Sequence, residues 1–346
     1  MPENSILIVG AGLSGLALAT HLVGAGRDVT LIESRKRVGG RIYSPNGFDL
    51  GPAWIWPGQP RIAALTGRLG LKVFEQHWQG DLIYEDAQGP AHRGPGQASM
   101  RGALRVAGGL GAVTRTLAEN LPDGVLRVGV QATGLMRDER GVSVVTDGAT
   151  IHADQVVLAI PPRLAARLNY TPQLSTAELA AMRAIPTWMA GHAKALARYD
   201  QPFWRAAGLS GDAHSRRGPM VEIHDASEDG GAGAIFGFMG IPASARRDQA
   251  ALRDATLAQL GRLFGAEAAT PLSLAITDWA NDPLTATTLD QTPLTHHPTY
   301  GLPRPLADLW DGALFLGSTE IATQFGGLVE GALEAAEEVF AKLRDR

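Results

Sequence analysis

The sequence predicts a mixed α/β fold in which two domains interleave, one built on parallel strands and one, of the α+β kind, built on an antiparallel sheet. Three observations lead to this prediction. A strand, a glycine-rich turn, a helix and a second strand follow one another in residues 6–33, and a strand followed by a long amphipathic helix closes residues 314–343. Between them, residues 187–198, 219–226 and 232–241 have the character of antiparallel strands. With 346 residues, the chain is also too long for one ordinary core.

The N-terminal unit has the order of elements that binds a dinucleotide. The apolar run 6–9 is bounded by glycine and predicts a buried strand; a GxGxxG turn, a helix and a strand over 29–32 follow, and Glu33 ends that strand. The first glycine permits the tight turn, the second lets the backbone approach a pyrophosphate, and the third lets helix and strand pack closely. Glu33 can accept hydrogen bonds from a ribose. We therefore expect an FAD/NAD(P)-binding Rossmann-like domain, with a turn made of Gly10, Ala11, Gly12, Leu13, Ser14 and Gly15.

The alternative reading of residues 5–25 is a signal peptide or a membrane helix. The glycine turn, His21 and the lack of an N-terminal basic region disfavour it.

A Gly-Gly-Arg sequence lies just beyond the acid-tipped strand, in the run from Ser34 and Arg35 to Gly39, Gly40 and Arg41. With it the chain resembles the FAD-dependent amine oxidase family: the flavin monoamine oxidases and their relatives, the polyamine oxidases and L-amino acid oxidases. This chain would be a short form. The resemblance implies that this run wraps the cofactor and that Arg41 faces its phosphates. The alternative is a basic loop on the surface.

Composition narrows the classes of function. Apolar residues make up 45% and charged residues 19%, as in a globular protein, and a net charge of −4 with a pI near 6.1 makes nucleic acid an unexpected partner. The absence of cysteine excludes disulfides, thiolate metal sites and a cysteinyl flavin bond, so we expect no metal and a noncovalent FAD unless a histidine is attached. The chain ends on a charged helix without a hydrophobic tail, which predicts a cytoplasmic protein with no membrane partner.

The run 48–54 resembles the Asp-Leu-Gly element that returns the family's chain to the flavin, with Gly51, Pro52, Ala53 and Trp54 as the implied contacts. Trp54 and Trp56 either line the entrance to the site or cover the core. Only 57 positions (108 − 51) separate Gly51 from Gly108, far fewer than in larger family members. We therefore expect a cavity that is smaller, more open or completed by another subunit.

Three further strands are predicted over 125–130, 141–147 and 154–160. The resemblance implies that the backbone of Val130 pairs with adenine. Helices are expected over 61–70 and 248–264. We assign residues 1–60, 105–162 and 280–346 to the FAD-binding domain, and residues 61–104 and 163–279 to the substrate-binding domain.

On the strand 219–226, period-two alternation places Met220, Glu222 and His224 on one face and Val221 and Ile223 on the other. One face should form the floor beneath the flavin, and the sequence does not say which. Met220 and Glu222 are candidate substrate contacts.

Three more elements extend the resemblance. Lys194, before Pro202-Phe203-Trp204, matches the family's lysine that holds a water at flavin N5, which makes it the candidate catalytic residue; a surface lysine is the alternative. Trp279 matches a tryptophan near the isoalloxazine ring. The glycine-led C-terminal helix would stabilise negative charge on the reduced flavin. The cofactor contacts implied in this region are Ser318, Thr319, Glu320, Gly327, Leu328 and Val329.

Two departures weaken the match to monoamine oxidases. Leu289 and Leu328 align with two aromatic residues that flank the flavin's substrate face, so small amines would not be oriented by aromatic faces. Both leucines and Trp54 are candidate substrate contacts. Ser318 also replaces a glycine of the family's Ala-Gly-Thr-Glu.

The leading hypothesis is an FAD-dependent oxidase that transfers a hydride from the α-carbon of a primary or secondary amine to flavin N5, giving an imine and hydrogen peroxide. Its small-molecule partners would be the amine and dioxygen. The second is a renalase-like dihydronicotinamide oxidase or a desaturase-like flavoenzyme, suggested by the short segment after Gly51 and the missing aromatic pair. The third is a flavin-binding sensor without turnover. The amine, the physiological electron acceptor and the oligomeric state are left open by the sequence.

Overall fold

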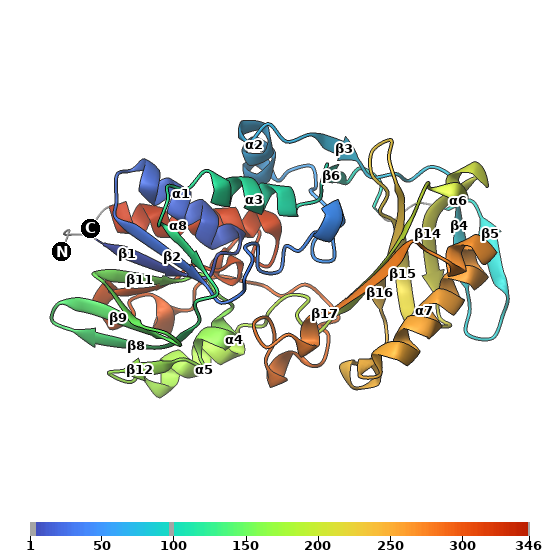
Figure 1. Ribbon diagram of the computed structural model, residues 1–346. Coiled ribbons are helices and arrows are strands. Elements are labelled where there is room, and N and C mark those ends of the chain that lie inside the picture. The colour runs from blue at the N-terminus through green and yellow to red at the C-terminus, as the bar shows by residue number, and fades with distance from the viewer. Residues whose placement is uncertain (1–4, 97–99, 345–346) are drawn as a thin grey trace.

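A computed structural model describes residues 5–96 and 100–344. It has two lobes, a sandwich of sheets and helices that holds both ends of the described chain and a large twisted sheet at the opposite end (Figure 1). The predicted mixed α/β architecture, with a parallel-sheet domain joined to an antiparallel-sheet domain, is confirmed. Among the described residues, no helix is both long and apolar enough to cross a membrane.

The first domain is organised by a five-stranded sheet with the order β18-β11-β1-β2-β7, in which every pairing is parallel. Its strands are β1 (Ile6–Val9), β2 (Val29–Glu33), β7 (Leu126–Val128), β11 (Gln155–Leu158) and β18 (Leu314–Leu316). Because all five run in one direction, the loops that follow them meet at one edge, where α/β sheets bind ligands.

Helices cover one face of this sheet and a second, four-stranded sheet lies on the other (Figure 1). The covering helices are α1 (Leu13–Gly24), α3 (Gly111–Glu119) and α8 (Val329–Arg344), with α2 (Pro60–Arg68) packed on α8. The second sheet has the order β10 (Thr150–Ala153), β9 (Gly141–Thr146), β8 (Ala132–Asp138) and β12 (Asn169–Thr171). The continuous apolar runs of β1 and β11 are buried because both faces of their sheet are covered.

The second domain is organised by a seven-stranded sheet, antiparallel except where β14 meets β4. In spatial order its strands are β17 (Ser273–Asp278), β13 (Ala193–Tyr199), β16 (Gly233–Met239), β15 (Met220–Asp225), β14 (Leu209–Ser215), β4 (Asp81–Glu85) and β5 (Ala91–Gly94). The helix α7 (Gln249–Phe264) packs on one face, and the other face turns toward the first domain (Figure 1). The other strands and α-helices of the described residues are β3 (Val73–Glu75), β6 (Leu104–Val106), α4 (Pro162–Ala165), α5 (Thr176–Ala184) and α6 (Phe203–Ala206).

Three boundaries differ from the sequence prediction. Residues 61–68, expected in the substrate domain, belong to α2, which packs on α8 of the first domain. Residues 163–184, expected in the substrate domain, supply α5 and β12, and β12 pairs with β8 of the first domain. The strand expected over 187–198 begins only at Ala193. The preceding residues form a turn in which Met189 has φ +62, a value that residues other than glycine rarely adopt and that ends strand geometry.

A β-bulge in β15 changes which of its side chains lie on the same face of the sheet. Met220 pairs with Met239 and Glu222 with Phe238, so Val221 is an extra residue between them. Met220 therefore lies beside Ile223 under α7, where its N–H donates to Gln259, and the prediction that Met220 shares a face with Glu222 and His224 is wrong. The face turned to the first domain carries Lys194, Phe236, Phe238, Glu222 and His224.

Candidate cofactor and active site

A cavity of about 370 Å³ lies between the two domains. Loops after β1, β2, β11 and β18 form one wall, and residues of β13 and β16 form another. Of the predicted cofactor, catalytic and substrate residues, those that line it are Gly10, Gly12, Leu13, Ser14, Glu33, Arg35, Gly39, Gly40, Arg41, Gly51, Pro52, Ala53, Trp54, Lys194, Trp279, Ser318, Thr319, Gly327, Leu328 and Val329. We call this space the interdomain cavity.

The three glycines of the turn differ in what a side chain at each position would contact. Gly10 has φ +107, and a Cβ on Gly15 would stand 2.0 Å from the carbonyl oxygen of Gly10. Both are therefore required by the protein's own backbone. A Cβ on Gly12 would meet no protein atom within 4 Å, although Gly12 lines the interdomain cavity. The space beside Gly12 thus fits a group that comes close to the backbone, as a pyrophosphate does.

Glu33 ends β2 with a buried carboxylate. Its Oε2 accepts a hydrogen bond from Ala11 N–H at 2.9 Å and its Oε1 one from Arg35 N–H at 2.8 Å. Each carboxylate oxygen has a second lone pair, so a ribose hydroxyl could be accepted as well. Arg35 extends across to Asp282 and Thr285, which joins this end of the cavity to the segment after β17.

The Gly-Gly-Arg run lies against the glycine turn. Gly39 has φ +97, and its N–H donates to Ala11 O at 2.8 Å. Arg41 lines the cavity, and its Nη1 lies 2.7 Å from Glu320 Oε1. Burial opposes the charge on Arg41, but Glu320 outweighs it and raises the pKa of the guanidinium. A permanent cation is therefore fixed beside the glycine turn, a position that suits an anionic group.

The loop before α8 is held by a buried carboxylate that the sequence analysis missed. Glu334 accepts hydrogen bonds from the N–H groups of Thr323, Gln324 and Phe325 at 3.0, 2.9 and 2.9 Å. Gly327, with φ +79, follows this loop, lines the cavity and lies just before the start of α8. A glutamate on the buried side of an amphipathic helix is the signal that could have identified this role.

Lys194 lies on β13 and is 2% exposed. Its Nζ donates to Gly51 O at 3.0 Å and lies 3.6 Å from the centroid of the Phe236 ring. Burial lowers the pKa of the ammonium to about 7, with Asp49 opposing and Arg105 adding to the effect. The surface-lysine alternative is thereby excluded, and a proton on this group can be gained or lost near neutral pH.

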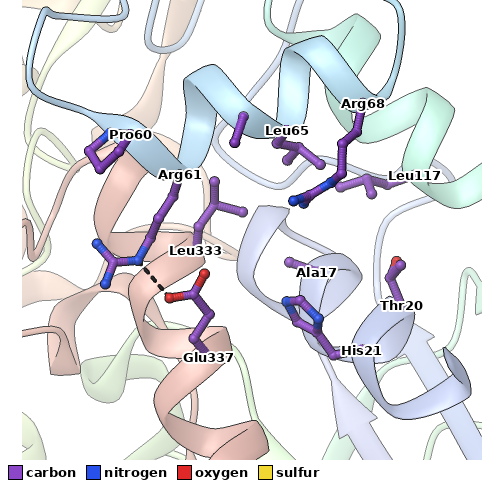
Figure 2. Close-up of a pocket in the computed structure, with 11 residues that line it drawn as sticks. Ala17, Thr20, His21, Pro60, Arg61, Leu65, Arg68, Leu117, Leu333 and Glu337 are labelled. Carbon is purple, nitrogen blue, oxygen red and sulfur yellow. Dashed lines mark hydrogen bonds and ion pairs between the residues drawn. The ribbon is translucent and has the colours of Figure 1, made fainter. Parts of the chain in front are cut away.

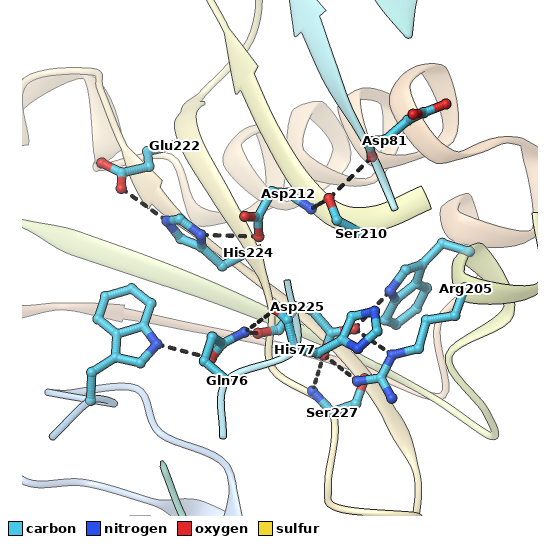
Figure 3. Close-up of polar contacts among 12 residues, drawn as sticks. Gln76, His77, Asp81, Arg205, Ser210, Asp212, Glu222, His224, Asp225 and Ser227 are labelled. Atoms are coloured by element: carbon cyan, nitrogen blue, oxygen red, sulfur yellow. Dashed lines mark hydrogen bonds and ion pairs between the residues drawn. The ribbon is translucent and has the colours of Figure 1, made fainter. Parts of the chain in front are cut away.

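Trp54 forms part of the cavity wall. It contacts a polar network that includes Gln76 and His224 (Figure 3). Its Nε1 donates to Gln76 Oε1 at 2.9 Å, and its ring meets His224 edge-on with centroids 5.1 Å apart. His224 lies between Asp212 and Glu222, 3.2 and 2.9 Å from their oxygens. Burial acts against the imidazolium, but the two carboxylates prevail and raise the pKa of His224.

Several predicted residues lie outside the cavity lining. Leu289 is 55% exposed and does not line the cavity, so the expectation that it flanks the substrate face is wrong. Val130 donates its N–H to Glu33 O at 2.9 Å, at the end of β2. The remaining members of this group are Ala11, Gly15, Ser34, Glu320, Glu222 and Met220.

The cavity also has lining residues that the sequence analysis did not identify. Trp188, Met189 and His192 come from the turn that was predicted as strand. Trp188 contacts His297 edge-on with centroids 4.9 Å apart. This part of the cavity thus has an aromatic wall, supplied by a different segment from the one expected.

A second cavity, of about 240 Å³, lies among α1, α2, α3 and α8 (Figure 2). Figure 2 shows Arg61 reaching Glu337, whose Oε2 is 2.7 Å from Arg61 Nε. None of its lining residues lines the interdomain cavity.

Comparison with known proteins identifies the family. Residues 13–97 and 93–339 match the flavin containing amine oxidoreductases. The chain belongs to this family. It is accordingly a flavin-dependent oxidoreductase that acts on amines, in agreement with the resemblance seen in the sequence.

Relatives and solved structures agree with this assignment. Putrescine oxidase of Kocuria rosea is 23% identical over 71% of this chain and 77% of its own length. L-amino acid dehydrogenase of a Synechocystis species is 24% identical over 96% of this chain and 93% of its own. Among solved structures, putrescine oxidase bound to putrescine has a TM-score of 0.83 at 23% identity, and cyclohexylamine oxidase of Brevibacterium oxydans one of 0.82 at 19%, each covering 99% of both chains. At these identities the structural matches show the family's fold.

Proposed function

We propose that the protein is an FAD-dependent oxidase of a primary or secondary amine, with FAD held noncovalently in the interdomain cavity. The observation that carries the proposal is the joining of two features in one cavity: the glycine-turn cradle beside Gly12 and the buried amine of Lys194 at Gly51. When bound, the flavin would take a hydride from the α-carbon of the amine, giving an imine, and pass the electrons to dioxygen, giving hydrogen peroxide.

The residues present fit FAD along the length of the cavity. Gly12 leaves room for the pyrophosphate, Glu33 accepts from the ribose, and Arg41 supplies the cation that faces the phosphates. The amino-terminal end of α8, at Val329, also lines the cavity. The positive end of its helix dipole would favour negative charge on the reduced ring. Without cysteine, no thioether can hold the ring.

Lys194 would hold a water beside the ring. Gly51 O fixes one side of Nζ and the Phe236 face lies under it, so its remaining N–H groups can serve the cavity. Since its pKa is about 7, the ammonium form is available near neutral pH to stabilise negative charge on reduced oxygen species during reoxidation.

The substrate end of the cavity is apolar and aromatic, with walls from Trp54, Phe238 and Leu328 and a further wall from Trp188. This lining favours the carbon skeleton of an amine over a polar substrate. Glu222 pairs with Phe238 across the sheet and holds its carboxylate beside His224. Glu222 is a candidate contact for a second cationic group on the substrate. Putrescine, a diamine that gives its name to one of the relatives above, would carry such a group.

An anaerobic screen tests the proposal. The purified flavoprotein is mixed with aliphatic mono- and diamines, arylalkyl amines and amino acids without oxygen, and the visible absorbance of the oxidised flavin is followed. We expect at least one amine to bleach it and oxygen to restore it with release of hydrogen peroxide. Bleaching by dihydronicotinamides and by no amine would reject amine oxidation in favour of a dihydronicotinamide oxidase.

A further inference from the structure

The second cavity, among α1, α2, α3 and α8, is a separate space from the interdomain cavity (Figure 2). Its volume of about 240 Å³ is that of about eight waters in the liquid, and it is below the roughly 300–1,000 Å³ of sites for drug-sized ligands. It therefore suits a small ligand, of about ten heavy atoms. We call this space the helical cavity.

The floor of the helical cavity is apolar. It is lined by Ala17 of α1, Leu65 of α2, Leu117 of α3 and Leu333 of α8, and each of these side chains is at most 6% exposed. All four belong to the core of the first domain, so the floor is fixed by the packing of the helices. The hydrocarbon or aryl part of a ligand would be removed from water on this floor, which favours binding.

The acidic side of the helical cavity is already satisfied. Glu337 is the acidic member of its lining among the described residues, and its Oε2 lies 2.7 Å from Nε of Arg61. Arg61 also lies 3.4 Å from Glu330, whose oxygens accept from the N–H groups of Arg61 and Ile62. Neither carboxylate therefore needs a cationic ligand.

Two nitrogen-bearing side chains on the opposite side have no partner. Figure 2 shows the guanidinium of Arg68 turned from α2 toward α1, and it has no hydrogen bond or ion pair with any residue that the structure describes. The imidazole of His21 contacts the ring of Phe340, with centroids 5.4 Å apart, and likewise has no hydrogen bond to a described residue. Burial lowers the pKa of His21, Glu337 opposes this, and the charge of Arg68 adds to it. The guanidinium and the imidazole therefore lie close enough to act on one ligand.

These features together select the chemistry of a ligand. A guanidinium presents a planar fork of N–H groups that matches a carboxylate with two parallel hydrogen bonds. The imidazole of His21 can donate one more N–H group. The positive charge of Arg68 disfavours an ammonium, and the apolar floor disfavours an anion without a hydrocarbon part. The complement is one carboxylate on a short apolar body.

We propose that the helical cavity binds a small carboxylate with an aryl or short alkyl body, which places its carboxylate on Arg68 and His21 and its body on the apolar floor. This site goes beyond the proposed function and does not depend on it. The two cavities nevertheless share a wall. Gln59 lines the interdomain cavity, and the next residue, Pro60, lines the helical cavity and begins α2.

Binding of 4-fluorophenylacetate to the native flavoprotein, followed by ¹⁹F NMR at pH 7.5 and low ionic strength, tests the proposal. We expect a dissociation constant on the order of 1 mM, as for a small ligand of about eleven heavy atoms. Arg68→Gln should weaken binding about tenfold, because it removes charge-assisted hydrogen bonds. The uncharged 4-fluorophenylacetamide should bind the native protein about tenfold more weakly for the same reason. Arg247→Gln, at an exposed position of the second domain, is the matched control and should bind as the native protein does.

A second variant locates the bound probe. Ala64 is an exposed residue of α2 that lines the helical cavity, so Ala64→Phe keeps Arg68 and fills the apolar space. It should weaken binding at least about tenfold. A dissociation constant unchanged in either variant, equal binding of the amide, or no binding to the native protein overturns the proposal. None of these outcomes bears on amine oxidation, which is measured separately by bleaching of the flavin.

Discussion

The amine of Lys194 and the carbonyl of Gly51 are joined by a hydrogen bond of 3.0 Å, across 143 positions of sequence. The bond ties the seven-stranded sheet of the second domain to the Asp-Leu-Gly segment of the first. It places a titratable nitrogen where the two domains meet the interdomain cavity. Both the stability and the chemistry of the protein should respond to this group.

Replacement of Lys194 by Met should slow reoxidation of the reduced flavin by oxygen by about 100-fold, since it removes a charge from beside the reacting oxygen. Reduction by amines should change far less. Reduced enzyme mixed with oxygenated buffer in a stopped-flow instrument gives the rate. Equal reoxidation rates in Lys194→Met and native enzyme would contradict the role assigned to the lysine.

The same substitution should alter the pH dependence of stability. Between pH 7 and about 10.4 the unfolded chain holds a proton on Lys194 that the folded chain, with its pKa of about 7, has released. More protons on the unfolded state mean that stability rises with pH in this window, by about 1.4 kcal/mol per unit. Urea unfolding at pH 7.5, 8.5 and 9.5 should show this slope in the native protein relative to Lys194→Met. A constant difference between the two would indicate an ordinary lysine pKa in the folded state.

Gly12 and Gly15 should respond to alanine in opposite ways. A Cβ on Gly12 enters open cavity, and Gly12 has φ −70, which alanine adopts freely. Gly12→Ala should therefore fold normally but bind flavin at least about tenfold more weakly. Gly15→Ala places a Cβ 2.0 Å from Gly10 O and should lower thermal stability instead. Flavin content and melting of the flavin-free proteins distinguish the two effects, and a stable Gly15→Ala protein would argue against the close approach of helix and turn at this position.

Glu330 should contribute strongly to stability although it lies outside the cavity. Its oxygens accept from the N–H groups of Arg61 and Ile62, both at 2.9 Å, and so cap the amino-terminal end of α2. Glu330→Ala leaves these groups without a partner and should cost about 2 kcal/mol or more. Glu337→Ala breaks the more exposed pair with Arg61 and should cost less than about 1 kcal/mol. Urea unfolding of both variants measures the difference, and equal costs would count against the cap.

Leu328 and Leu289 provide a matched pair for the substrate side. Leu328 lines the cavity, whereas Leu289 is exposed outside it. Leu328→Phe should narrow the cavity and raise the KM for bulky amines more than for small ones, and Leu289→Phe should leave both unchanged. Steady-state kinetics with a short alkylamine and an arylalkyl amine tests this. A change in Leu289→Phe as large as that in Leu328→Phe would restore the alignment on which the sequence prediction relied.

Local sequence signals predicted the strand, turn, helix and strand of residues 6–33 correctly, and features that depend on distant residues were missed. The unit from Ile6 to Glu33 was predictable because its turn glycines and its apolar periodicity act over a few residues. The bulge at Val221 was not, because register depends on the partner strand β16. The cavity turn at Met189 was missed because the residue with the positive φ is a methionine and not a glycine, the residue that usually signals one.

The central claim is that the interdomain cavity holds FAD without a covalent bond, and release of the cofactor tests it most directly. The purified protein is denatured with acid, the precipitate is removed, and the supernatant is assayed for flavin before and after phosphodiesterase digestion. We expect about one flavin per chain in the supernatant, with fluorescence that rises on digestion, as it does when FAD is cleaved to FMN. A colourless protein, a flavin that remains with the precipitate, or a released flavin unaffected by digestion would contradict the account.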